Sequence, residues 1–167
     1  MAGRTLARGP CPHKPLPFRR DPHHIAALMQ IHASCAARGE AGVLLLGPAG
    51  SGKSDLVLRL IDRGFLLVAD DRVDIENGVA RAPAGLAGML EVRGLGIVRL
   101  PHLASARLAL AVALGGPAER LPSPARHADL GLPLLPLDPA SPSAAARVAL
   151  ALDCALGLVP QVAGAFA

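Results

Sequence analysis

A glycine-rich stretch places one lysine and one serine at a spacing that suits phosphate binding. Residues 47–54 read GPAGSGKS and match the pattern G-x-x-x-x-G-K-[ST] at every fixed position. In this pattern the glycines let backbone N–H groups turn toward phosphate oxygens, the lysine reaches the β- and γ-phosphates, and the serine hydroxyl binds Mg²⁺. The candidate nucleotide-binding residues are therefore Gly47, Pro48, Ala49, Gly50, Ser51, Gly52, Lys53 and Ser54.

The choice of basic residues supports this interpretation. The chain has 17 Lys and Arg residues, of which only Lys14 and Lys53 are lysines. A lysine kept where arginine is otherwise used indicates a task for a compact ammonium, such as reaching into a loop that holds phosphates. The alternative is a glycine-rich turn that matches by chance, in a chain with 18 glycines.

Two acidic residues follow the glycine-rich stretch at a spacing along the chain that suits a metal ligand or a catalytic base. Asp70 and Asp71 end an apolar run about one βαβ unit after the glycine-rich stretch. Adjacent side chains point in opposite directions on an extended chain, so one acid can face Mg²⁺ while the other faces an acceptor hydroxyl. The alternative is a polar turn that ends a strand.

Other polar residues are less informative when taken alone. His32 lies in an apolar run, which favours a buried core histidine. Glu91 and Arg93 are two positions apart, which favours a surface ion pair, and Gly94 and Gly96 indicate a bulge or a close approach of the backbone to a ligand.

These residues need a framework of strands with few helices. The pair Asn77-Gly78 predicts a hairpin, Gly64 predicts the end of the helix that follows Gly52, and Ser141 or Ser143 predicts the cap of a closing helix. The fold class is therefore α/β with a mixed parallel and antiparallel sheet. The expected strands are 27–37, 42–47, 65–71, 73–82 (a hairpin), 90–100, 106–114 and 132–138, and the closing helix is 141–157.

Length and composition indicate one domain. The chain has 167 residues and a net charge of +4, much of it from a basic leader, residues 1–24, that we expect to be disordered. The folded domain is expected over 25–160, with a tail over 161–167.

Three scattered cysteines favour a reducing, cytoplasmic setting without disulfides or zinc, with Cys35 and Cys154 buried. No segment is long and apolar enough to span a membrane.

Three segments together resemble the HPr kinase/phosphorylase family, in a short form of its C-terminal catalytic domain that lacks the N-terminal domain. They are IHASCAARGEAGVLLLGPAGSGKSDL (31–56), LLVADDRV (66–73) and LEVRGLGIV (90–98). His32 also precedes Gly47 at the family's spacing. The resemblance covers residues 28–100 well and the remainder weakly.

The resemblance implies a P-loop fold related to phosphoenolpyruvate carboxykinase. It also implies a kinase that uses ATP and Mg²⁺ to phosphorylate a serine of HPr, a small carrier protein of the sugar phosphotransferase system. Neither a nucleic-acid nor a membrane partner is expected. The catalytic residues that it implies are Asp71 as the base, His32 and Lys53. The metal ligands that it implies are Ser54, Asp70 and Glu91.

The chain departs from the family at residues 138–141, where many members have an arginine that serves the reverse reaction. The sequence DPAS has none, so phosphorylase activity is left open, as is assembly into a homo-oligomer. Two other functions also stay open. One is a P-loop kinase of another acceptor, and the other is a nucleotide-sensing module without catalysis.

Overall fold

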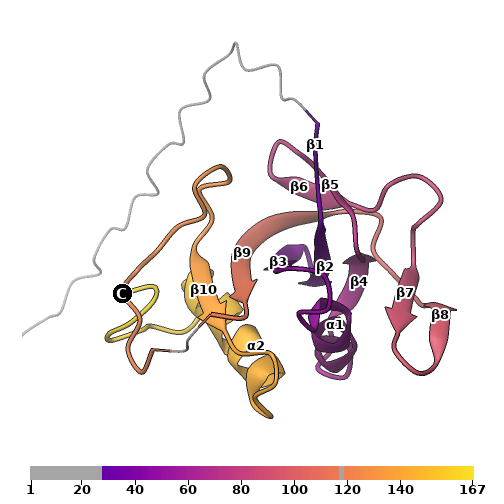
Figure 1. The fold of residues 1–167 in the computed structure, drawn as a ribbon. Coiled ribbons are helices and arrows are strands. Elements are labelled where there is room, and N and C mark those ends of the chain that lie inside the picture. Colours follow the sequence, from indigo (N-terminus) through magenta and orange to yellow (C-terminus); the bar gives the residue numbers. More distant parts are fainter. Residues whose placement is uncertain (1–27, 117–118) are drawn as a thin grey trace, which may run out of the picture.

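The structure, a computed structural model, describes residues 28–116 and 119–167. The expected leader, residues 1–24, lies outside this part of the chain. Two helices and ten strands form within the described residues (Figure 1). The helices are α1 (Lys53–Ile61) and α2 (Ala144–Ala155). The strands are β1 (Met29–Ile31), β2 (Ala33–Arg38), β3 (Ala41–Leu46), β4 (Leu66–Ala69), β5 (Val73–Glu76), β6 (Val79–Arg81), β7 (Met89–Val92), β8 (Gly96–Arg99), β9 (Ala106–Leu114) and β10 (Leu134–Leu137).

Eight of these strands form one mixed sheet, as the sequence predicts. Its order is β1-β5-β6-β9-β3-β2-β4, and β10 also pairs with β9. The long strand β9 is parallel to β3 along one edge, while its other edge pairs first with β6 and then with β10. The hairpin β7–β8 forms a separate two-stranded sheet beside β4 and α1.

Both helices pack against one face of the large sheet (Figure 1). The apolar face of α1 buries Leu56, Val57 and Leu60 completely, and each such side chain contributes about 2 kcal/mol of hydrophobic stabilisation. The chain leaves α1 through Gly64, whose φ of 82° is the left-handed conformation that glycine adopts easily. A second apolar cluster, which includes Leu44, Val68 and Ile75, fills the opposite face of the sheet.

Several local predictions are confirmed. Asn77 and Gly78 both have positive φ, 53° and 73°, as a two-residue hairpin turn between β5 and β6 requires. The helix that follows the glycine-rich loop, the strand before Asp70 and the closing helix are all present.

Other local predictions are wrong. The run 27–37 is not one strand, because the chain bends at His32 between β1 and β2, and these strands pair with different partners. The run 90–100 is a hairpin of two strands. Cys154 is only partly buried. Ser143 does occupy the N-cap position of α2, as one of the two predicted caps, but its side chain makes no capping hydrogen bond.

Neither helix of the described chain has the length and apolarity needed to cross a membrane.

Candidate active site

The glycine-rich loop, residues 47–52, connects the buried strand β3 to the first residue of α1. Gly50 and Gly52 have φ of 78° and 87°, in the left-handed region that favours glycine. A Cβ atom at Gly47 would lie only 2.6 Å from Ser51 Oγ. Gly50 and Gly52 are therefore favoured by their backbone conformation, and Gly47 by the lack of space for a side chain. The loop leaves the N-terminus of α1, the positive end of the helix dipole, open to a ligand.

Lys53, the first residue of α1, folds its side chain back under this loop. Its Nζ donates to the backbone carbonyls of Gly47 and Pro48, both at 2.9 Å, and lies 3.0 Å from His32 Nε2. The residue is 6% exposed. Burial lowers the pKa of the ammonium, while the nearby carboxylates of Asp71 and Asp70 act in the opposite direction.

His32 connects Lys53 to Asp71. Its Nδ1 lies 3.1 Å from Asp71 Oδ1, and the two side chains are 45% and 69% exposed. The expectation of a buried core histidine is therefore wrong, because the chain bends between β1 and β2 and the ring lies against Lys53 beside the loop. An ammonium only donates, so Nε2 accepts from Lys53, and the neutral ring donates its Nδ1–H to the Asp71 carboxylate.

The two adjacent acids occupy different environments. Asp71 has a φ of 65°, a left-handed conformation that aspartate tolerates better than most residues, and its side chain faces solvent. Asp70 is 8% exposed and accepts from the Ser54 hydroxyl at 2.9 and 3.0 Å. The turn after β4 thus directs one carboxylate to the start of α1 and the other to His32.

Asp70 has two further partners that sequence reasoning missed. The fully buried hydroxyl of Ser34 donates to Asp70 at 2.6 Å, and the backbone N–H of Glu91 donates at 3.3 Å. Ser34 is the only hydroxyl in the apolar strand β2. A single serine in an apolar strand could have indicated this contact, because a buried hydroxyl needs a hydrogen-bond partner.

A cavity of about 460 Å³ lies over the loop and the start of α1. Most of the predicted site residues line this cavity, and they are Ala49, Gly50, Gly52, His32, Lys53, Ser54, Asp71 and Glu91. Four do not reach its surface: Gly47, Pro48 and Ser51 lie within the loop, and Asp70 lies behind Ser54. The hairpin β7–β8 forms the remaining wall through Glu91, Val92 and Arg93.

The oxygen atoms at this cavity suit a hard cation. Ser54 and Asp70 are in direct contact, and the exposed carboxylate of Glu91 lines the same cavity. Within the described residues, no group of three or more His, Cys, Asp or Glu side chains encloses a metal position. Mg²⁺ commonly takes one or two carboxylates and completes its shell with phosphates and water, so the oxygen atoms of Ser54, Asp70 and Glu91 are donors of the kind that this ion binds.

Three comparisons place the chain among known proteins. The family model described as HPr Serine kinase C-terminal domain matches residues 23–107, just over half of the chain. The HPr kinase/phosphorylase of Clostridium novyi (strain NT) is 53% identical over 66 residues, which cover 37% of this chain and 22% of that protein. The same enzyme of Clostridium beijerinckii is 42% identical over 83 residues, 47% of this chain and 28% of that protein.

Similarity in three dimensions extends further along the chain. The structure of the Hpr(Ser) kinase/phosphatase from Coxiella burnetii matches with a TM-score of 0.61 and 26% sequence identity, and the match covers 78% of this chain and 92% of that one. The matched part of this chain spans only 22% and 28% of the length of the two Clostridium relatives above.

Fold and relatives together define a mixed α/β domain that is similar to domains of HPr kinases. The chain belongs to the HPr serine kinase C-terminal domain family, as its sequence resemblance predicts.

Proposed function

We propose that this chain is an ATP- and Mg²⁺-dependent kinase that phosphorylates a serine of an HPr-like carrier protein, with a P-loop domain of the phosphoenolpyruvate carboxykinase type over 25–160. The observation that carries the proposal is the meeting of three features at one cavity. These are the glycine-rich loop with Lys53, the contact between Ser54 and Asp70, and the exposed carboxylate of Asp71 beside His32.

In the proposed reaction Asp71 is the base. One carboxylate oxygen accepts from His32, and the other is available to take the proton of the acceptor serine. The serine oxygen then bonds to the γ-phosphorus, the bond from that phosphorus to the β,γ-bridging oxygen breaks, and ADP leaves. Lys53 and the loop N–H groups hold the phosphates in line and balance their charge, which supplies most of the rate in phosphoryl transfer.

Ser54, Asp70 and Glu91 are the residues that would hold Mg²⁺. When bound, the ion would neutralise part of the negative charge of the phosphates. Ser34 and the Glu91 N–H fix the Asp70 carboxylate in position before any ligand arrives.

The test is transfer of label from γ-labelled ATP to purified HPr from the same source, in the presence of Mg²⁺. The chain should label a serine of HPr, and Asp71→Asn should reduce the rate by at least a hundredfold. Asparagine is a better comparison than alanine, because it removes the charge while it tolerates the positive φ at this position. Asp71→Ala adds a second control.

The same assay separates the alternatives. Tight ATP binding with no label on HPr would contradict the proposal and favour a nucleotide-sensing module or another acceptor. Labelled HPr that releases its phosphate on addition of inorganic phosphate would show that phosphorylase activity remains without an arginine at 138–141.

A further inference from the structure

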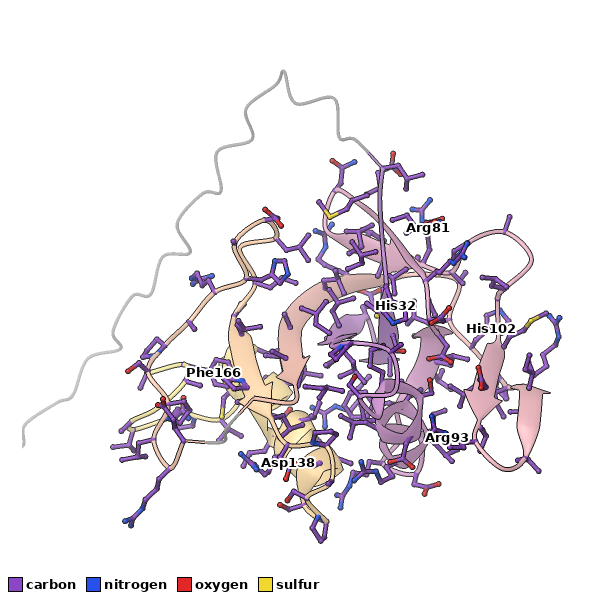
Figure 2. All side chains as sticks on the ribbon, viewed as in Figure 1. His32, Arg81, Arg93, His102, Asp138 and Phe166 are labelled. Carbon is purple, nitrogen blue, oxygen red and sulfur yellow. The ribbon has the colours of Figure 1, made fainter. Side chains whose placement is uncertain are left out.

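The cavity extends beyond the residues that the proposed transfer uses. Past the loop it continues between α1 and the β7–β8 hairpin, where it is lined by Asp55, Leu58, Val92 and Arg93. We name this part the hairpin side. Leu58 and Val92 are half-buried apolar side chains that pack against the core below, and Arg93 is exposed above them. Figure 2 shows Arg93 between α1 and the hairpin.

The opposite flank of the loop is closed. Pro139 lies about 3.5 Å from the position that a Cβ of Gly52 would occupy. Arg59 of α1 holds that segment in place by donating to the carbonyls of Pro139 at 2.5 Å and of Ser141 at 3.3 Å. A ligand that extends from the loop therefore has room on the hairpin side and not beside Pro139.

The direction of the phosphate chain follows from the loop. In this kind of loop the backbone N–H groups hold the α- and β-phosphates and the lysine reaches the β- and γ-phosphates. The γ end thus lies toward Lys53, His32 and Asp71, and the α end, with its nucleoside, points away from them. Apart from these three, the cavity is lined by the loop, by Ser54 and Glu91, which we propose to hold the metal ion, and by the residues of the hairpin side.

A base on the hairpin side needs a flat group to stack on. The described residues include no Trp or Tyr and two phenylalanines, of which Phe65 is buried in the core and Phe166 lies at the other end of the molecule (Figure 2). Of the planar side chains that line the cavity, His32 is engaged by Lys53 and Asp71, whereas Arg93 makes no hydrogen bond or ion pair with any other described residue. A guanidinium group stacks well on an aromatic ring.

The hairpin turn holds Arg93 in this position. The N–H of Leu95 donates to the carbonyl of Val92 at 2.9 Å and closes a four-residue turn around Arg93 and Gly94. Gly94 has a φ of 82°, which the third position of a type II turn requires. The turn explains Gly94 without a bulge, and Arg93 is its second residue.

Resting on the proposed function, we infer that the hairpin side is the nucleoside subsite and that Arg93 is its specificity residue. Its guanidinium plane stacks on the base between the apolar side chains of Leu58 and Val92. Arg93 thereby makes the site prefer a nucleoside triphosphate to a bare phosphate chain.

The test is calorimetric binding of two probes, Mg-ATP and Mg-tripolyphosphate, to the chain without any acceptor. Arg93→Ala should weaken ATP binding about tenfold and leave tripolyphosphate binding within about twofold. Arg93→Lys should behave like the alanine variant toward ATP, because lysine keeps the charge and loses the plane. Arg63→Ala removes an exposed arginine that does not line the cavity and should change neither affinity.

Each other result overturns the inference. Equal weakening of both probes would make Arg93 a phosphate contact, full ATP affinity in Arg93→Lys would make it a charge contact, and no change would place the nucleoside elsewhere. Absence of ATP binding by the unsubstituted chain would instead overturn the proposed function itself, and the inference with it. Normal ATP binding and an unaffected Arg93→Ala variant would overturn the inference alone.

Discussion

The Nζ atom of Lys53 lies 3.0 Å from Nε2 of His32, so the only lysine among the described residues donates to a ring that in turn donates to a carboxylate. This contact sets the tautomer of the imidazole, since an ammonium group has no lone pair to offer. It also links the loop that we propose to bind phosphates to the carboxylate that we propose as the base.

The first prediction concerns this link. His32→Ala should lower kcat for HPr phosphorylation about tenfold or more, because Asp71 loses the donor that orients it. The KM for ATP should stay within about threefold, since Lys53 keeps its two carbonyl partners. His102→Ala, at an exposed histidine that does not line the cavity, is the control. A large rise in KM with unchanged kcat would show that His32 serves binding only.

The second prediction concerns Ser34. Ser34→Ala should lower the free energy of unfolding by about 1.5–3 kcal/mol, because it removes a buried hydrogen bond to a charged group. Half-maximal activity should need more Mg²⁺, since Asp70 is less firmly held. Ser143→Ala, whose hydroxyl makes no capping bond, should leave the unfolding free energy nearly unchanged. Urea unfolding of both variants measures the difference, and equal stabilities would contradict the prediction.

The third prediction concerns how the titration of Lys53 changes the free energy of unfolding at high pH. Burial lowers the pKa of Lys53 below its ordinary value of 10.5. Between the folded and unfolded pKa values the unfolded chain binds more protons, so this group makes the unfolding free energy rise with pH. The chain has no Tyr and only one other lysine, which leaves few competing titrations.

Lys53→Met should remove that contribution. The difference in unfolding free energy between the unsubstituted chain and Lys53→Met should therefore shift in favour of the unsubstituted chain as pH approaches 10.5. Cys35 acts in the opposite direction above pH 9, but it is present in both proteins and cancels in the difference. A difference that does not vary with pH would show that the ammonium is not perturbed.

The fourth prediction concerns the reactivity of Cys35. Complete burial in β2 raises the pKa of this thiol from 9.0 to about 12, so the native protein holds almost no thiolate at pH 8.5. Iodoacetamide should modify Cys154, which is partly buried, and leave Cys35 unmodified until urea is added. Peptide mapping by mass spectrometry separates the two sites. Rapid native modification of Cys35 would mean that β2 opens readily.

Local signals in the sequence predict local structure well. Asn77-Gly78 predicts its turn because both residues tolerate positive φ, and Gly64 predicts the end of α1 for the same reason. The pattern at 47–54 predicts a loop between a strand and a helix, which is where it lies. Each of these predictions depends on residues close together in the chain.

Features that depend on distant residues were missed. The bend at His32 arises because β1 pairs with β5 while β2 pairs with β3 and β4, and no local signal near His32 reveals those partners. Likewise Arg59 and Pro139 meet across the fold, and Ser34 meets Asp70. The glycine-rich pattern at 47–54 indicates where the cavity lies. The other residues that line the cavity come from segments distant in sequence, which only the sheet topology brings together.

The parallel pairing of β3 with β9 has a consequence for how this chain matures. Ala41 pairs with Arg107 and Leu46 with Ala113, so the strand that leads into the glycine-rich loop lacks one neighbour until β9 has left the ribosome. β9 in turn pairs with β10, which ends at Leu137. A segment cut at residue 107, where the family match ends, would keep the sequence motifs and lose most of the central strand. Such a segment would leave β3 without most of its parallel neighbour, and non-local pairing of this kind also slows folding.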